Sequence, residues 1–153
     1  MLTKVGKALR IISDEKKEKI ALLLDGASLL PNFQITNLKK LKDTLSEIGT
    51  TKVGIFFIDQ TLTEKESIAI TAQGFREEIV WSDIDMHITV NSLEFMNNKL
   101  IDIIGIASTN PILFPVFSRI KQEKKLLIIT WKKDVSSAIE SIADYILYLD
   151  FLT

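Results

Sequence analysis

Six short apolar runs recur along the chain, and stretches with helical periodicity separate them. The runs are almost continuous in Ile, Leu, Val and Phe rather than alternating with polar residues, which is typical of strands buried on both faces. Strands that alternate with helices in this way form a parallel sheet with right-handed crossovers and helices on both faces. The sequence therefore predicts one three-layer α/β domain, with strands at 20–24, 52–58, 77–81, 100–107, 124–130 and 144–149 and helices at 37–48, 63–73, 84–97, 112–122 and 135–143.

Length and composition agree with one globular domain and exclude several classes of site. A chain of 153 residues is long enough for one well-formed core and short for two. Cysteine is absent, which excludes disulfides, thiolate metal sites and a thiol nucleophile. No apolar stretch approaches the roughly 18 residues of a membrane span. We expect no membrane span and a cytoplasmic location.

The first 19 residues differ from the rest in charge. They hold six Lys or Arg against three acidic residues, although the whole chain has a net charge of −1. Leu2, Val5, Leu9 and Ile12 fall on one stripe at helical spacing. The pattern predicts an amphipathic N-terminal helix or arm over 1–19 that docks on its own domain, on a partner or on an anionic surface. The α/β domain is expected over 20–153.

Polar residues follow several of the predicted strands. In open parallel sheets, ligands bind beyond the carboxyl ends of the strands. Asp25 ends the first apolar run, where a buried carboxylate is costly unless a cation or hydrogen-bond donors compensate it. Two interpretations are open: Asp25 is a metal ligand, or its carboxylate accepts N–H groups from the next turn. Asp59, Asp83, Asp85, Asn110 and Asp134 are expected at the same edge.

Motifs of several common enzyme classes are missing. The sequence contains neither G-x-G-x-x-G nor a P-loop, so we expect no dinucleotide. It also lacks the G-x-S-x-G turn of serine hydrolases. His87 is the single histidine, and its place within an apolar helical stretch favours a structural role.

Three stretches together resemble a known family. They are "LLLDGASL", "SDIDMHITVNSLEFM" and "IGIASTNPILFPVFSRIKQEKKLLIIT". In this order and spacing they resemble the NYN domain, a branch of the PIN-like nucleases, and most of all its single-domain archaeal type. The resemblance covers about residues 20–150 and implies the strand order 3-2-1-4-5. It also implies a ribonuclease whose carboxylates at the strand ends hold Mg²⁺ or Mn²⁺.

The acidic site that the resemblance implies is incomplete here. Asp25 and Asp85 match metal-binding acids of the family, whereas Asn91, Asn110 and Ile112 stand where it has further acids. Two carboxylates roughly neutralise one divalent ion and leave almost no negative charge for a second. Mg²⁺ dehydrates reluctantly and binds weakly to so few carboxylates. The expected catalytic set is Asp25, Asp85, Asn91 and Asn110, with weak Mg²⁺ or Mn²⁺ binding at Asp25 and Asp85.

A second group of residues suggests contact with RNA. Ser28 replaces an asparagine of the family motif and keeps a hydrogen-bonding group. Trp131 follows the fifth strand, where it could stack on a base while Lys132 and Lys133 meet phosphates. In the alternative interpretation, Trp81 and Trp131 pack over sheet edges or at a subunit interface.

Three functions are compatible with these features. The first is a degenerate NYN domain with weak or no nuclease activity that binds RNA, a protein partner or a second copy of itself. The second is an active Mg²⁺- or Mn²⁺-dependent ribonuclease with a reduced site. The third is a structural subunit of an assembly.

Overall fold

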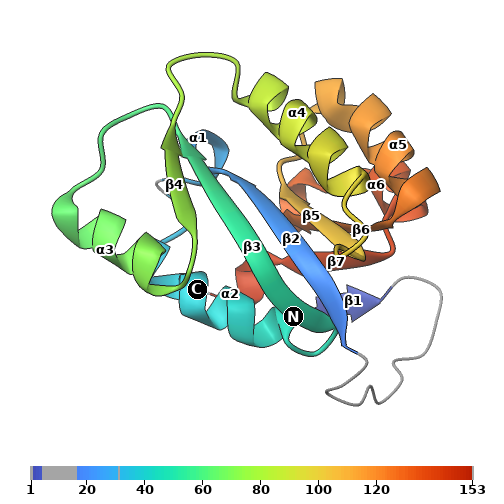
Figure 1. Cartoon of the computed structure of the whole chain (residues 1–153), viewed down its shortest axis with the longest axis horizontal. Coiled ribbons are helices and arrows are strands. Elements are labelled where there is room, and N and C mark those ends of the chain that lie inside the picture. Colours follow the sequence, from blue (N-terminus) through green and yellow to red (C-terminus); the bar gives the residue numbers. More distant parts are fainter. Residues whose placement is uncertain (1, 5–16, 31, 153) are drawn as a thin grey trace.

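The structure, a computed structural model, describes residues 2–4, 17–30 and 32–152 (Figure 1). Its centre is a sheet in which six parallel strands have the order β4-β3-β2-β5-β6-β7. Counted along the chain, this is the order 3-2-1-4-5-6, so the predicted fold class and strand order are confirmed. The parallel strands are β2 (Glu18–Asp25), β3 (Gly49–Ile58), β4 (Arg76–Ile79), β5 (Ile103–Ala107), β6 (Lys125–Thr130) and β7 (Tyr145–Tyr148).

Helices cover both faces of the sheet and bury two separate apolar clusters. One face carries α1 (Gly26–Leu29), α2 (Leu38–Leu45) and α3 (Glu64–Ala72), and the other carries α4 (Ile84–Met96), α5 (Phe114–Glu123) and α6 (Ser137–Ile142). Figure 1 shows α4, α5 and α6 grouped on one side of the sheet. Short 3₁₀ turns complete the loops: η2 (Ile35–Asn37), η3 (Pro111–Leu113), η4 (Lys132–Asp134) and η5 (Leu149–Phe151).

The strand β2 lies in the middle of the sheet, with a neighbouring strand at each edge and helices over both faces. It pairs with β3 on one side and β5 on the other, so that Leu24 lies between Phe56 and Ala107. Every side chain from Ile20 to Asp25 is buried. The continuous apolar run of this segment is what such a position requires. Its carboxyl end therefore opens on the centre of the sheet edge.

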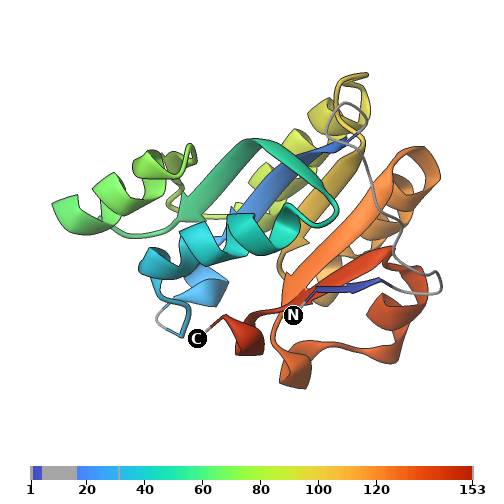
Figure 2. The same ribbon diagram turned by 90° about the horizontal axis from the view of Figure 1, so that it is seen from below.

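The predicted N-terminal helix is wrong where the structure describes it. Leu2–Lys4 form a strand, β1, which pairs antiparallel with β7 and places Leu2 opposite Leu147. Figure 2 shows this short strand, in dark blue, alongside the red β7. Without β1, the outer edge of β7 would present unpaired backbone groups, which a neighbouring strand satisfies. Val5, Leu9 and Ile12 lie outside the described residues.

The helices of the described residues are short. None of them is long and apolar enough to cross a membrane.

Candidate functional site

Asp25 is both the last residue of β2 and the N-cap of α1. Its Oδ1 accepts the Ser28 N–H at 3.1 Å, and its Oδ2 accepts the Ser28 hydroxyl at 2.6 Å. The side chain is only 5% exposed, so these two donors replace much of the water that a carboxylate loses on burial. The interpretation of Asp25 as a helix cap is therefore confirmed.

Gly26 allows this turn to lie close to the neighbouring strand. A Cβ at this position would lie 2.4 Å from the Phe57 carbonyl oxygen and 2.6 Å from the Phe56 ring. Only glycine lets α1 begin so near to β3, directly after its capping residue Asp25.

Asp85 and Asn110 meet across the sheet edge. Asp85 lies in the first turn of α4, and its Oδ2 accepts a hydrogen bond from Asn110 Nδ2 at 2.7 Å. Asn110 is the N-cap of η3, where its Oδ1 accepts the Ile112 N–H at 3.2 Å. Asp83, in the left-handed conformation with φ 56°, sets the entry of the chain into α4. Both ends of the Asn110 amide are thus in use.

The electrostatic environment of Asp85 disfavours its charge. Partial burial raises its pKa above the ordinary value of 3.8, and the nearby negative charge of Asp25 raises it further. The hydrogen bond from Asn110 acts in the opposite direction, and Asp83 adds a smaller upward effect on the pKa. Asp85 Oδ1 is buried and accepts no hydrogen bond from the described residues. One carboxylate oxygen of this group is therefore left unsatisfied.

We expect Asp85→Asn to stabilise the protein at neutral pH. A carboxyl whose pKa is raised on folding binds its proton more tightly in the folded state, so ionisation costs folding free energy above that pKa. An asparagine keeps an acceptor for Asn110 and removes the repulsion with Asp25. Urea unfolding at pH 7 should show a gain of about 0.5–1 kcal/mol. The gain should vanish as the pH falls below the ordinary value of 3.8, where the wild-type carboxyl is protonated.

The matched control is Asp59→Asn, because Asp59 is an exposed acid at the same edge and does not contribute to the Asp85 pKa. Asp59→Asn should leave unchanged the difference in unfolding free energy between pH 7 and a pH below 3.8. A loss of stability in Asp85→Asn at pH 7 would show that the charge of Asp85 is needed.

The donor set at this edge suits one cation at most. Within the described residues, no group of three or more His, Cys, Asp or Glu side chains is placed to hold a metal ion. Asp25, Asp85 and the Asn110 amide supply oxygen ligands, but Asp25 and Asn110 are already engaged in caps. Mg²⁺ demands octahedral oxygen coordination, which here would have to come largely from water.

The remaining predicted catalytic residue, Asn91, lies apart from this group. Asn91 donates its Nδ2 to the His87 carbonyl of its own helix at 2.8 Å. Six residues along a helix correspond to about 240° of net rotation, so Asn91 and Asp85 lie on different faces of α4. Ile112 is exposed to solvent beside Asn110. The structure brings together Asp25, Ser28, Asp85 and Asn110, and it leaves out Asn91.

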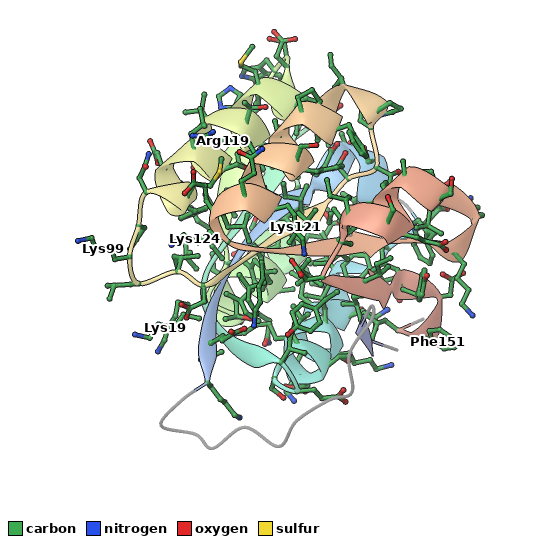
Figure 3. All side chains as sticks on the ribbon, turned by 90° about the vertical axis from the view of Figure 1, so that its right-hand side faces the viewer. Lys19, Lys99, Arg119, Lys121, Lys124 and Phe151 are labelled. Carbon is green, nitrogen blue, oxygen red and sulfur yellow. The ribbon has the colours of Figure 1, made fainter. Side chains whose placement is uncertain are left out.

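The predicted RNA-binding residues are partly occupied by contacts within the chain. Trp131 is half-buried and packs against the apolar cluster of the α1–α3 face. The Lys132 ammonium lies 4.3 Å from the centre of the Phe151 ring, and the Lys132 N–H donates to Asp150 at 2.8 Å. Phe151 is labelled in Figure 3. Lys133 is exposed, and RNA contact by this group stays a prediction.

Trp81 and His87 have different surroundings. Trp81 lies beyond the end of β4 and is 79% exposed, so it packs over no sheet edge of its own chain and only the subunit-interface alternative stays open for it. His87 lies on the flank of α4 with its Nδ1 3.6 Å from Glu78 and its ring 6.2 Å from that of Phe57. These contacts agree with a structural role for His87.

A hollow of about 440 Å³ lies between the end of α1, η2 and α3. It is lined by both apolar and polar side chains, among them Phe33, Gln60 and Glu66. Sequence reasoning did not find it, because its residues come from loops and helix ends that share no motif. Glu66 is already committed to the capping box of α3 with Thr63.

Comparisons with known proteins identify similar chains without a described activity. No family model matches the sequence. An uncharacterized protein of the archaeon Methanocaldococcus jannaschii, MJ0482, is 30% identical over 132 residues, which are 86% of this chain and 55% of that protein. The chain thus spans about half the length of this relative. A crystal structure of a protein of unknown function from Vibrio parahaemolyticus, VPA0982, matches with a TM-score of 0.73 over 92% of this chain and 98% of that one. At 17% identity, the latter likeness shows the shared fold alone.

Proposed function

We propose that the chain is a nuclease-like domain of the NYN type that has lost efficient metal-dependent cleavage and acts as an interaction module. The observation that carries this proposal is the contact between Asn110 and Asp85. An amide donor lies 2.7 Å from the carboxylate oxygen at the point where the family resemblance implies another acid. At this point the edge has a hydrogen-bond donor toward Asp85 where a further acid would add a metal ligand.

The charge at this edge supports the same conclusion. Two-metal hydrolysis needs enough carboxylates to hold both ions and to stabilise the attacking and leaving oxygens. Asp25 and Asp85 are the acids that the structure brings together, and both oxygens of Asp25 accept bonds from Ser28. One divalent ion would neutralise these two carboxylates, so a second ion would have to rely on other acids of the same edge, such as Asp59 and Asp83.

One observation favours a second candidate, a ribonuclease with a single metal ion. Asp85 Oδ1 is buried without a hydrogen-bond partner among the described residues, close to the negative charge of Asp25. Buried polar atoms are rarely left unpaired, and a cation between the two carboxylates would satisfy this oxygen.

The choice between RNA and protein as the partner depends on the exposed side chains. Lys132 lies over an aromatic ring and Trp131 is half-buried, so less of their surface is available for the predicted contacts with phosphates and bases. Exposed apolar side chains gather on α4 instead. We therefore favour a protein partner, which also covers the structural-subunit alternative.

The test of lost catalysis is thermal unfolding and RNA cleavage with and without millimolar Mn²⁺. We expect the melting temperature of the wild type to stay unchanged within about 1 °C, because its edge lacks the charge to bind the ion tightly. Cleavage of a single-stranded RNA should equal that of Asp85→Asn. A rise of several degrees, together with cleavage that disappears in Asp85→Asn and persists in the control Asn91→Ala, would establish the single-metal ribonuclease instead.

A further inference from the structure

The outward face of α4 carries a stripe of exposed apolar side chains. Met86 is 62% exposed, Val90 48% and Leu93 49%. The opposite face of the same helix buries Ile88, Ser92 and Met96 against the sheet. The helix is thus apolar on both sides, although only one side is covered by its own chain.

Such a face is unusual for a helix at the surface of a monomer. A surface helix normally has one apolar stripe toward the core and a polar face toward solvent. A contiguous apolar patch with a polar rim marks an interaction site more often than isolated exposed residues do. Here the rim on the β4 side is polar, since Glu78 contacts both Arg76 and His87.

The spacing of the stripe is that of a coiled-coil seam. Met86, Val90, Leu93 and Asn97 follow one another at intervals of four, three and four residues, which is the alternation of a and d positions. In this heptad assignment Val90 and Asn97 occupy a positions, and Met86 and Leu93 occupy d positions. The face therefore fits another helix rather than a flat surface.

We propose that the occupant of this face is the α4 helix of a second copy of the chain, packed antiparallel across a two-fold axis. The proposal rests on the interaction role in the proposed function and does not depend on the loss of cleavage. In an antiparallel pair, Met86 of one copy lies against Asn97 of the other, and Val90 lies against Leu93. Each contact then occurs twice, as a two-fold interface requires.

Charge at the two ends of α4 favours the antiparallel direction and the self-pairing. Asp83 and Asp85 lie at the start of the helix, and Lys99 follows its end. Figure 3 shows Lys99 projecting away from the molecule. Antiparallel packing places the acidic end of one helix beside the lysine of the other, whereas parallel packing would place like charges together. The opposed helix dipoles also favour this direction.

Sedimentation velocity of the purified chain, with two matched variants, tests the proposal. We expect the wild type to sediment as a dimer at tens of micromolar. Leu93→Asp should weaken the dimer by at least about a hundredfold, because an unpaired charge would be buried against Val90 of the other copy. The control is Ile68→Asp, which places the same change at a 58% exposed position on α3, across the sheet. It should leave the dimer intact.

Cysteine cross-linking tests the direction, since the chain has no cysteine of its own. In a mixture of Met86→Cys and Asn97→Cys under mild oxidation, the antiparallel pair gives a disulfide between the two different variants. Each variant alone should cross-link poorly, because its two cysteines would lie about 16 Å apart along the helix axis.

Three results would overturn the proposal: a monomeric wild type at this concentration, a dimer that Leu93→Asp leaves intact, or cross-linking of each variant with itself. The Mn²⁺ measurement is independent of all three, so the dimer can fail while the loss of cleavage stands. Conversely, a dimer with metal-dependent cleavage would leave this proposal standing and reject the other.

Discussion

Replacing Gly26 with alanine should destabilise the protein by about 3 kcal/mol or more, the upper range for overpacking a closed core. The added Cβ would lie 2.4 Å from the Phe57 carbonyl oxygen and 2.8 Å from Ile58 Cγ2. The first of these atoms belongs to the backbone of β3, a strand held on both sides by β2 and β4, so it cannot move without disturbing the sheet. For a domain of this size the loss corresponds to a fall of about 6–12 °C in melting temperature.

Calorimetry of the wild type, Gly26→Ala and the control Ala27→Ser would measure this effect. Ala27 is exposed in the same turn, so its change should remain within about 0.5 kcal/mol. If Gly26→Ala unfolds at the wild-type temperature, α1 does not lie against β3 as the structure has it.

Asn110→Asp should convert the hydrogen-bonded edge into a repulsive one. Aspartate keeps an acceptor for the Ile112 N–H, so the cap of η3 survives, but it replaces the donor that faces Asp85 Oδ2 at 2.7 Å. Two carboxylates at this distance cannot both ionise without a large penalty. We expect a loss of about 2–3 kcal/mol at pH 7 without metal, a typical cost for an unpaired charge in a network.

The same variant should gain the metal response that the wild type is expected to lack. With Asp25, Asp85 and a third carboxylate at position 110 on one edge, Mn²⁺ at a hundredfold excess over its dissociation constant would restore about 2.7 kcal/mol. The control Asn110→Ala removes the donor and the cap without adding charge, so Mn²⁺ should not stabilise it. Urea unfolding of the three proteins with and without Mn²⁺ measures the difference. Equal responses in both variants would show that the charge at position 110 does not control binding.

The fold could be predicted well because its signal is carried by many residues. Each central strand, such as 20–24, is a continuous apolar run, and burial on both faces leaves few other assignments. The N-terminal segment could not be predicted in the same way. Leu2–Lys4 pair with a strand more than 140 residues away, and a local periodicity contains no information about such a partner.

The candidate site was predictable only in part. The position of Asp25 at a strand end identifies it as a residue with a special role. Its cap is predictable because the N–H group that it accepts lies only three residues further along the chain. The contact between Asp85 and Asn110 joins the first turn of α4 to the N-cap of η3, 25 residues further on, so its geometry depends on the packing of α4 over the sheet. Asn91 belongs to the expected set through the family resemblance alone, and the helical rotation turns it away from Asp85. The sequence does not predict the exposed apolar stripe on α4, since apolar residues on all sides of a helix ordinarily indicate a buried helix.

The pairing of β1 with β7 has a consequence for the order in which the chain assembles. The first strand in the sequence bonds with the last, with Lys4 opposite Tyr145, so this contact closes a loop of nearly the whole chain. The entropy of closing a loop grows with its length, and contacts between neighbours in sequence form at a lower entropic cost. The parallel core from β2 to β7 can therefore condense before β1 is in place. Until β1 pairs with it, the outer edge of β7 can pair with any other extended segment, including β1 of a neighbouring molecule. Exchange of strands between copies would therefore begin at this edge.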